Sequence, residues 1–303
     1  MPVRRVPAAL AWRDPGVPGI EALEPWLAAR EAAVPGLRPG AAKAVLWAGR
    51  RAERTALSLV YLHGFSAAAP ELRPLPDLVA AALGANLHFA RLAGHGSTGP
   101  AMAGAGLADW ADNLAEAIAI GRRIGGKVIV MGSSMGGALA TLAALDPAHG
   151  RDVAGLMLIA PAYRLRGAGA RALTAPLASV WGRRLLRGTR TVPPRGPRHG
   201  AAWTLDYPMV SLLPLGALVG HVGRADFRRA RIPAAFAFAD ADRIVDARAI
   251  RRAAAEWGAP ARLLPRVMGP QDDIASHVIA GDILSPGQTA PLARDLACWA
   301  RGL

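Results

Sequence analysis

The sequence has 303 residues, 52% of them hydrophobic, and carries a formal net charge of +14. This length and apolar content are typical of one large α/β domain with an insertion. No uninterrupted run of 18 apolar residues, no export signal and no second cysteine beside Cys298 is found, so a cytoplasmic protein without disulfides is expected. Arginine carries nearly all of the positive charge, but no basic segment is interleaved with aromatic residues, so nucleic acid is not an expected partner.

The N-terminal segment is expected to contain one helix and two strands. Residues 1–19 hold four prolines and are predicted to form an irregular arm. Residues 20–31 have the apolar spacing of a helix that begins or kinks at Pro25. Two apolar runs, 45–47 and 57–62, are predicted strands joined by a charged turn. We expect these two strands to pair in an antiparallel manner at the edge of a sheet.

Short apolar strands alternate with helices from residue 57 to residue 160. The predicted strands are 57–62, 86–90, 127–131 and 153–161, and the predicted helices are 72–83, 107–124 and 138–145. This alternation is typical of a mostly parallel sheet with helices on both faces. Ligands of such sheets bind beyond the carboxyl ends of the strands, so we expect the functional residues there.

Residues 163–231 interrupt the alternation and are expected to form a helical cap over the sheet. Prolines recur in them, 189–200 is a predicted loop, and 173–186 and 209–222 are short amphipathic segments. This region has only two aspartates, Asp206 and Asp226, against thirteen arginines: Arg164, Arg166, Arg171, Arg183, Arg184, Arg187, Arg190, Arg195, Arg198, Arg224, Arg228, Arg229 and Arg231. We interpret this charge as a solvated surface, although it would also attract an anionic acyl substrate or an anionic membrane surface.

The alternation resumes after residue 231. A strand over 234–239, a helix over 247–257, a last strand over 262–267, a loop over 269–277 and a helix over 289–301 are predicted. The expected organisation is therefore an N-terminal arm and helix (1–44), a core (45–162 and 232–303) and a cap (163–231).

The most informative motif is Gly-x-Ser-x-Gly at residues 132–136, between the strand 127–131 and the helix 138–145. A strand, a turn with this motif and a helix are together typical of a nucleophile elbow. The two glycines allow a very tight turn, which strains the serine backbone and exposes the hydroxyl of Ser134. The helix N-terminus behind Ser134 presents unpaired N–H groups to a developing oxyanion.

A second motif, His63-Gly64-Phe65-Ser66, follows the strand 57–62. Gly64 allows the backbone N–H of Phe65 to turn toward a site above the sheet, where it would form an oxyanion hole with the N–H of Met135. We interpret His63 as structural, because its place in the chain is wrong for a base that serves Ser134. His95, in a glycine-rich loop, is likewise expected to shape the wall of the site.

An exposed serine needs a histidine base, and the expected order along the chain places the base last. Four histidines follow Ser134: His149, His199, His221 and His277. Of these, His149 lies at the far end of the predicted elbow helix, and His199 and His221 lie in the cap. Only His277 follows the last strand, where a loop would bring it over Ser134.

The base in turn needs a carboxylate that orients it and stabilises its cation. Such an acid is expected directly after the strand 234–239, which leaves Asp240, Asp242 and Asp246. Asp242 fits best, because the apolar residues that follow it would be buried after a turn, and Asp240 is the alternative. Asp272 and Asp273 lie near His277 in the sequence, but we expect them to be solvated loop residues.

These motifs make the chain resemble the α/β-hydrolase fold superfamily, nearest its bacterial carboxylesterase, monoacylglycerol-lipase and lysophospholipase-like members. The resemblance covers roughly residues 55–303 and is carried by His63-Gly64-Phe65, Gly94-His95-Gly96, residues 132–137, residues 242–245 and His277. It implies a catalytic triad of Ser134, Asp242 and His277, with the N–H groups of Phe65 and Met135 as the oxyanion hole. The chain departs from many relatives at residues 67–69, where three alanines replace residues that are often polar.

We therefore expect a serine hydrolase that cleaves a small-molecule carboxylic ester with an apolar acyl group through an acyl-enzyme on Ser134. A thioesterase, an amidase or a peptidase would use the same residues, and a non-catalytic binder would keep the fold without the chemistry. A peripheral membrane protein that docks through the basic cap is a third hypothesis. No cofactor is expected, and no residues have the spacing of metal ligands.

Overall fold

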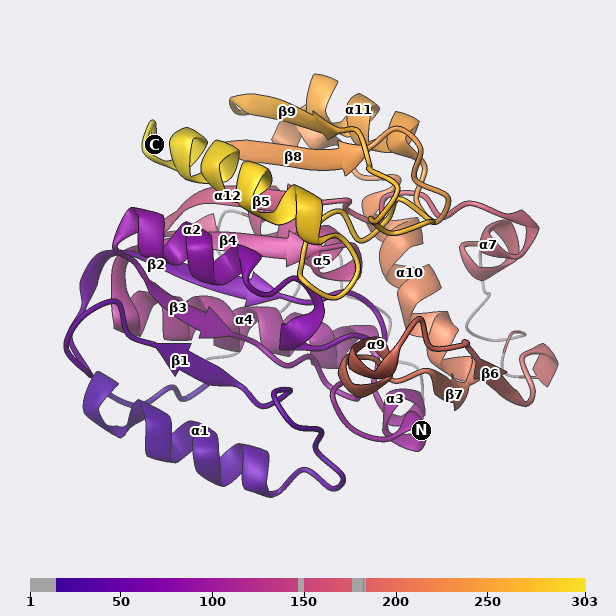
Figure 1. The fold of residues 1–303 in the computed structure, drawn as a ribbon, viewed down its shortest axis with the longest axis horizontal. Coiled ribbons are helices and arrows are strands. Elements are labelled where there is room, and N and C mark those ends of the chain that lie inside the picture. The colour runs from indigo at the N-terminus through magenta and orange to yellow at the C-terminus, as the bar shows by residue number, and fades with distance from the viewer. Residues whose placement is uncertain (1–14, 147–149, 176–181, 183) are drawn as a thin grey trace.

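A seven-stranded sheet forms the centre of the protein, and its strand order is β1-β3-β2-β4-β5-β8-β9. The computed structural model describes residues 15–146, 150–175, 182 and 184–303 (Figure 1). The strands are β1 (Ala44–Leu46), β2 (Thr55–Leu62), β3 (Asn86–Phe89), β4 (Gly125–Ser133), β5 (Val153–Ile159), β8 (Ala234–Ala239) and β9 (Ala261–Arg266). All neighbours run parallel except β1, which pairs with β3 in an antiparallel manner. The predicted mostly parallel α/β sheet is confirmed.

The expected pairing of the first two strands is wrong, because β3 lies between β1 and β2. The register pairs Ala44 with Phe89, and both edges of β2 are taken by β3 and β4. The side chain of Asn86 binds the segment between β1 and β2. Its Oδ1 accepts the N–H of Ala48 at 2.9 Å, and its Nδ2 donates to the carbonyl oxygen of Glu53 at 2.7 Å. The polar turn is thereby bound to the start of β3.

Helices cover both faces of the sheet, and β2 shows how the core is divided. Its alternate residues point to opposite faces. Leu59 and Tyr61 pack in the cluster beneath α2 (Leu75–Leu83) and α12 (Pro286–Ala300), whereas Val60 and Leu62 pack on the opposite face. The helices on that face are α4 (Leu107–Ile124), α5 (Met135–Leu145) and α11 (Ala247–Ala255). Both faces are apolar, so the parallel strands read as continuous hydrophobic runs.

The N-terminal helix α1 (Leu23–Ala32) packs beside β1 and α4, after the short 3-10 helix η1 (Ile20–Ala22). Pro25 falls in its first turn, where a proline removes no helical hydrogen bond. At the other end of the helix, Glu31 is buried and receives two hydrogen bonds from Arg91, at 2.6 and 2.8 Å. The bidentate pair anchors α1 to the segment that follows β3, near the carboxyl ends of the strands.

The segments between β5 and β8 stay outside the large sheet and lie beyond the carboxyl ends of its strands, on the right of Figure 1. They comprise α7 (Ala168–Leu173), β6 (Thr189–Thr191), α9 (Pro197–Ala202), β7 (Asp206–Pro208), η3 (Met209–Ser211), α10 (Leu212–Val222) and η4 (Phe227–Arg229). The expected loop 189–200 is wrong in part, because β6 pairs with β7 in a two-stranded sheet and α9 begins at Pro197. The predicted segment 173–186 lies partly outside the described residues.

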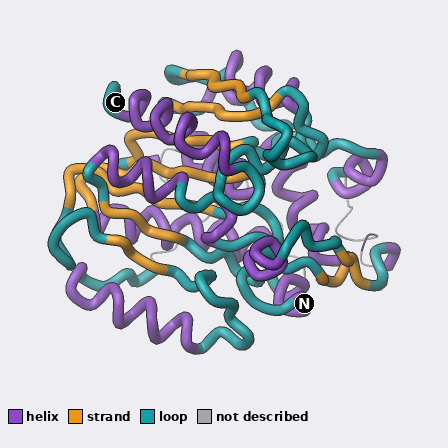
Figure 2. Tube along the Cα trace, viewed as in Figure 1, coloured by secondary structure: helices purple, strands orange, loops and turns teal. Residues whose placement is uncertain are grey.

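Short helices and loops dominate this end of the molecule (Figure 2). η2 (Ala69–Glu71) follows the predicted oxyanion loop, and α3 (Gly99–Gly104) contacts β7. Within the described part of the chain, none of the helices is long and apolar enough to cross a membrane.

Candidate active site

The turn between β4 and α5 has the strained geometry of an elbow. Ser134 has φ 49° and ψ −108°, a backbone conformation that residues other than glycine rarely adopt. Such a conformation costs about 1–3 kcal/mol of stability. A Cβ on Gly132 would lie 2.4 Å from the carbonyl oxygen of Gly136, and one on Gly136 would lie 2.2 Å from that of Leu62. Since both distances are shorter than any real contact, the motif requires glycine at both positions.

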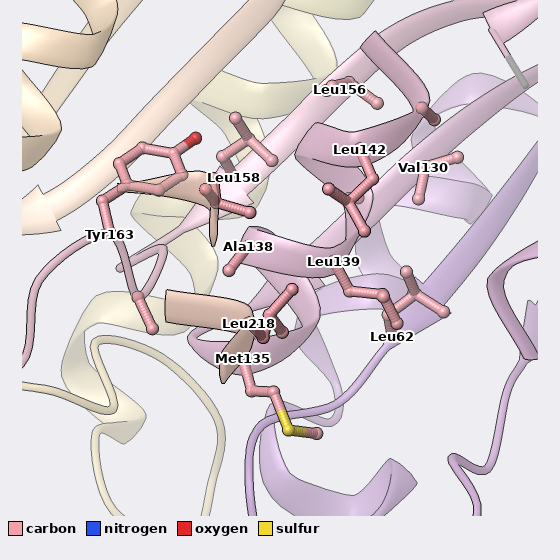
Figure 3. Packing of buried hydrophobic residues seen from close by; sticks show 14 of the residues in the cluster. Leu62, Val130, Met135, Ala138, Leu139, Leu142, Leu156, Leu158, Tyr163 and Leu218 are labelled. Carbon is pink, nitrogen blue, oxygen red and sulfur yellow. The ribbon is translucent and has the colours of Figure 1, made fainter. Parts of the chain in front are cut away.

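The surrounding structure stabilises the strained serine. Its N–H donates to the carbonyl oxygen of Ile159 at 2.8 Å, and its own carbonyl oxygen accepts the N–H of Ala162 at 3.0 Å. Figure 3 shows the first turns of α5 packed into the core, with Leu139 and Leu142 toward Leu62 of β2 and Val130 of β4, and with Ala138 near Leu218 of α10. These contacts make the elbow part of the rigid core, which holds the Ser134 side chain in a defined place.

Ser134, His277 and Asp242 form one chain of hydrogen bonds. His277 Nε2 lies 2.9 Å from Ser134 Oγ, and His277 Nδ1 lies 2.7 Å from Asp242 Oδ2. Because a carboxylate only accepts, Nδ1 carries the proton in this arrangement and Nε2 can accept the serine hydroxyl. The other oxygen of Asp242 accepts the N–H groups of Ile244 and Val245 at 2.7 and 2.8 Å, and the carboxylate is fully buried.

The other candidate acids point elsewhere. Asp240 is exposed and binds Arg251 through two hydrogen bonds of 2.6 and 3.0 Å, which lower the pKa of its carboxyl group. Asp246 accepts the N–H of Arg248 at the start of α11 and pairs with Arg164. Among the three aspartates after β8, Asp242 is therefore the one that contacts His277.

Among the described residues, no other histidine contacts Ser134. His199 Nδ1 accepts the N–H of Arg195 at 3.1 Å, His221 is exposed at the end of α10, and His149 lies outside the described residues. His63 matches its expected structural role, because its Nε2 accepts the N–H of Leu92 at 3.1 Å and its Nδ1 lies 2.8 Å from the carbonyl oxygen of Gly64. Burial lowers the pKa of His63 to about 3, which keeps the ring neutral.

The two predicted oxyanion donors lie at the ends of β2 and β4. Met135 is the first residue of α5, so its N–H has no partner within the helix. In the described segments, no acceptor binds this N–H or that of Phe65. Gly64, which precedes Phe65, is held in place because its N–H donates to Glu71 Oε2 at 2.7 Å. A free N–H on a fixed loop can donate to a developing oxyanion without reorganisation.

The sequence profile of the Alpha/beta hydrolase family matches residues 59–286, which span all of these groups. The chain belongs to this family. No match is found among curated proteins.

Solved structures of other alpha/beta hydrolases superpose over most of this hydrolase. A structure from work on the metagenome-derived lipolytic enzymes LipS and LipT has a TM-score of 0.68 at 20% identity, over 88% of this chain and 100% of the other. The monoacylglycerol lipase of Paleococcus ferrophilus gives 0.62 at 14% identity, over 86% and 98%. A soluble variant of the Saccharomyces cerevisiae monoglyceride lipase gives 0.64 at 13% identity, over 89% and 96%. At these identities the likeness shows the shared fold.

The interpretation of Asp273 in this hydrolase as a solvated loop residue is wrong. Its side chain is buried and organises the loop that carries His277. Asp273 Oδ2 accepts the N–H groups of His277 and Val278, each at 3.0 Å. Its Oδ1 accepts the N–H of Ala275 at 3.1 Å and pairs with Arg195, which lies between β5 and β8. An aspartate that binds N–H groups two to five residues later is a common turn device, which offers a weak sequence signal.

Asp272 is also buried, contrary to the same prediction. Its Oδ2 accepts the N–H of Gly269 at 2.7 Å and the Nε2 of Gln288 at 3.2 Å. It therefore holds the start of the loop against α12, whereas Asp273 holds the part next to the histidine.

Glu71 is a further buried carboxyl group that the sequence did not identify. It accepts hydrogen bonds from Tyr61 Oη and from the N–H of Gly64, both at 2.7 Å. Burial raises the pKa of Glu71, while the hydrogen bonds and the nearby His277 oppose this shift. A Cβ on Gly64 would lie 2.5 Å from Glu71 Oε1, so a larger residue at this position would displace the carboxyl group. Glu71 thus fixes the residue that precedes the Phe65 N–H.

The segment between β5 and β8 is attached to both loops of the site. The N–H of Thr204 donates to the carbonyl oxygen of Ser66 at 2.7 Å, and Arg195 pairs with Asp273. Arg38 reinforces this attachment from the N-terminal part by donating to the carbonyl oxygens of Gly200 and Trp203, at 3.0 and 2.5 Å. Among the described residues, no group of three or more His, Cys, Asp or Glu side chains could hold a metal ion.

Proposed function

We propose that this protein is a serine hydrolase that cleaves carboxylic esters through an acyl-enzyme formed on Ser134. The observation that carries the proposal is the hydrogen-bonded chain from Ser134 Oγ through His277 to the buried Asp242. The strained elbow and the free N–H groups beside it are the other parts that acyl transfer needs.

In the proposed reaction, Ser134 Oγ attacks the ester carbonyl carbon while His277 Nε2 takes the hydroxyl proton. The N–H groups of Phe65 and Met135 stabilise the oxyanion, and one such donor contributes about 3–4 kcal/mol to catalysis. The imidazolium, stabilised by Asp242, then protonates the leaving alcohol as the acyl-enzyme forms. His277 next removes a proton from water, which attacks the acyl-enzyme and releases the acid.

Two observations support an ester with an apolar acyl group. The structural relatives include lipolytic enzymes and monoacylglycerol lipases. The segments that carry the reacting groups are also lined by apolar and aromatic side chains. The ring of Phe65 lies 5.4 Å from that of Tyr207, and Val278 packs against the buried cluster that contains Trp203. In this proposal, residues 163–231 act as a cap that determines which acyl chains enter.

The proposal is tested by hydrolysis of nitrophenyl esters of graded acyl length and by labelling with a fluorophosphonate. Both are expected for the wild type and lost in Ser134→Ala. Ser133→Ala is a matched control next to the nucleophile, and we expect it to remain labelled. A thioester and an amide of the same acyl chain distinguish the related activities. A folded wild type without labelling would contradict the proposal and favour a non-catalytic binder.

A further inference from the structure

A cavity of about 790 Å³ lies between the region 163–231 and the core. Its walls are formed by the segment after β5, the last turns of α10 and the first turns of α11. Neither Ser134 nor His277 lines it. The volume is in the range of small-molecule sites, whereas an extended peptide or a nucleic-acid duplex needs a longer surface.

The charge of this cavity is strongly unbalanced. Among the described residues, the only carboxylate that lines it is that of Asp246. The arginines that line it are Arg164, Arg166, Arg224, Arg248 and Arg252. They come from three separate elements, so helical periodicity on one solvated face does not explain the cluster. Like charges around one cavity repel one another, and an anion bound among them would relieve the repulsion.

Contacts with the walls fix the positions of several guanidinium groups. Arg252 donates to the carbonyl oxygen of Gly223 at 2.9 Å, and Arg166 donates to that of Asp242 at 2.6 Å. Arg224 lies against Gly220, because a Cβ there would be 3.3 Å from its Nη2. A guanidinium has five N–H donors, so each group held by one contact keeps donors for a ligand.

Asp246 neutralises only part of this charge. Its side chain accepts the N–H of Arg248 at 2.9 Å and pairs with Arg164. The side chains of Arg224 and Arg248 have no acidic partner in the described part of the chain. Both residues are exposed, so their side chains are accessible to a ligand in solution.

We propose that this cavity binds a small polyanion that carries two or more phosphate or carboxylate groups. The planar fork of arginine matches the oxygen atoms of these groups in a bidentate manner, which lysine does not. Several guanidiniums around one concave space favour a ligand with more than one anionic group over a single ion. This site is separate from the proposed ester site, and its ligand differs from the proposed substrate in charge.

The test is isothermal titration of the protein with inorganic pyrophosphate and with citrate at low salt. We expect one binding site that weakens as salt is raised from about 0.02 M to about 0.5 M. Arg224→Ala and Arg248→Ala are each expected to weaken binding about tenfold or more. Arg251→Ala is the matched control, since it lies on the same helix and removes the same charge but does not line the cavity.

Three outcomes would overturn the proposal. They are the absence of binding to the wild type at millimolar anion, an equal loss of affinity in Arg251→Ala, and binding only to vesicles that contain anionic lipid. Because Arg224 and Arg248 are both exposed, their substitution should leave the melting temperature unchanged. A loss of binding is thereby separated from a loss of folding. The titration measures the heat of anion binding and does not depend on turnover. Failure of ester hydrolysis and failure of anion binding are therefore distinguishable.

Discussion

Substitution of Asp273 by asparagine tests whether the buried aspartate positions the proposed catalytic histidine. The carboxylate accepts three backbone N–H groups through its two oxygens and also pairs with Arg195. Asparagine has the same shape but only one acceptor oxygen. In either orientation, its NH₂ group must face at least one N–H that the carboxylate accepted. The loop that carries His277 is therefore expected to shift.

The structure sets the size of the effect. One buried N–H left without an acceptor costs about 1–3 kcal/mol, and the remaining bonds lose the assistance of the negative charge, about 1 kcal/mol each. The Arg195 pair adds little, since that side chain is 37% exposed. We expect the free energy of unfolding to fall by about 3–5 kcal/mol. A shift of the imidazole by about 1 Å would lower kcat about a hundredfold.

The assay combines urea unfolding with steady-state hydrolysis of a short nitrophenyl ester at temperatures where the variant is folded. A positioning role predicts a lower kcat with little change in KM. Asp272→Asn is the matched control, because it removes a carboxylate from the same loop that holds Gly269 and Gln288 but not His277. If Asp273→Asn kept the wild-type kcat, or if both variants lowered kcat equally, the reasoning would be refuted.

Three further predictions concern the acid, the elbow and a buried histidine. Asp242→Asn should lower kcat/KM about 10⁴-fold while Asp240→Asn stays near the wild type, and a reversed order in the ester assay would identify Asp240 as the acid. Gly136→Ala should prevent soluble expression, because its Cβ would lie 2.2 Å from a carbonyl oxygen, whereas Gly104→Ala meets open space and should express normally. Burial lowers the pKa of His88 from 6.5 to about 3, so its neutral form contributes stability above pH 6.5 that is lost as the pH falls toward 3. His88→Asn should therefore reduce the slope of unfolding free energy against pH in this window by about 1.4 kcal/mol per unit, and an unchanged slope in urea titrations would contradict this burial.

Local patterns in the sequence determined the elements and the place of the elbow. The tight turn at residues 132–136 was predictable because the motif Gly-x-Ser-x-Gly lies between a strand and a helix that each have a clear sequence pattern. Chain order also indicated His277 and Asp242, since parallel strands bring their carboxyl ends to one edge of the sheet. Their hydrogen-bond distances to Ser134 come from the structure.

Only the tertiary structure decided which strands are neighbours and which charges are buried. β3 separates β1 from β2, and its residue Asn86 binds the intervening turn through a contact with Ala48, 38 residues away in the sequence. Asp273 and Glu71 have the same side-chain chemistry as solvated acids, and it is the fold that buries both of them, beside Arg195 and Tyr61 from other segments. The arginine-lined cavity likewise assembles from three elements. Periodicity and turn chemistry act over a few residues, whereas pairing, burial and charge clusters depend on contacts between distant segments, which one sequence does not encode as a local pattern.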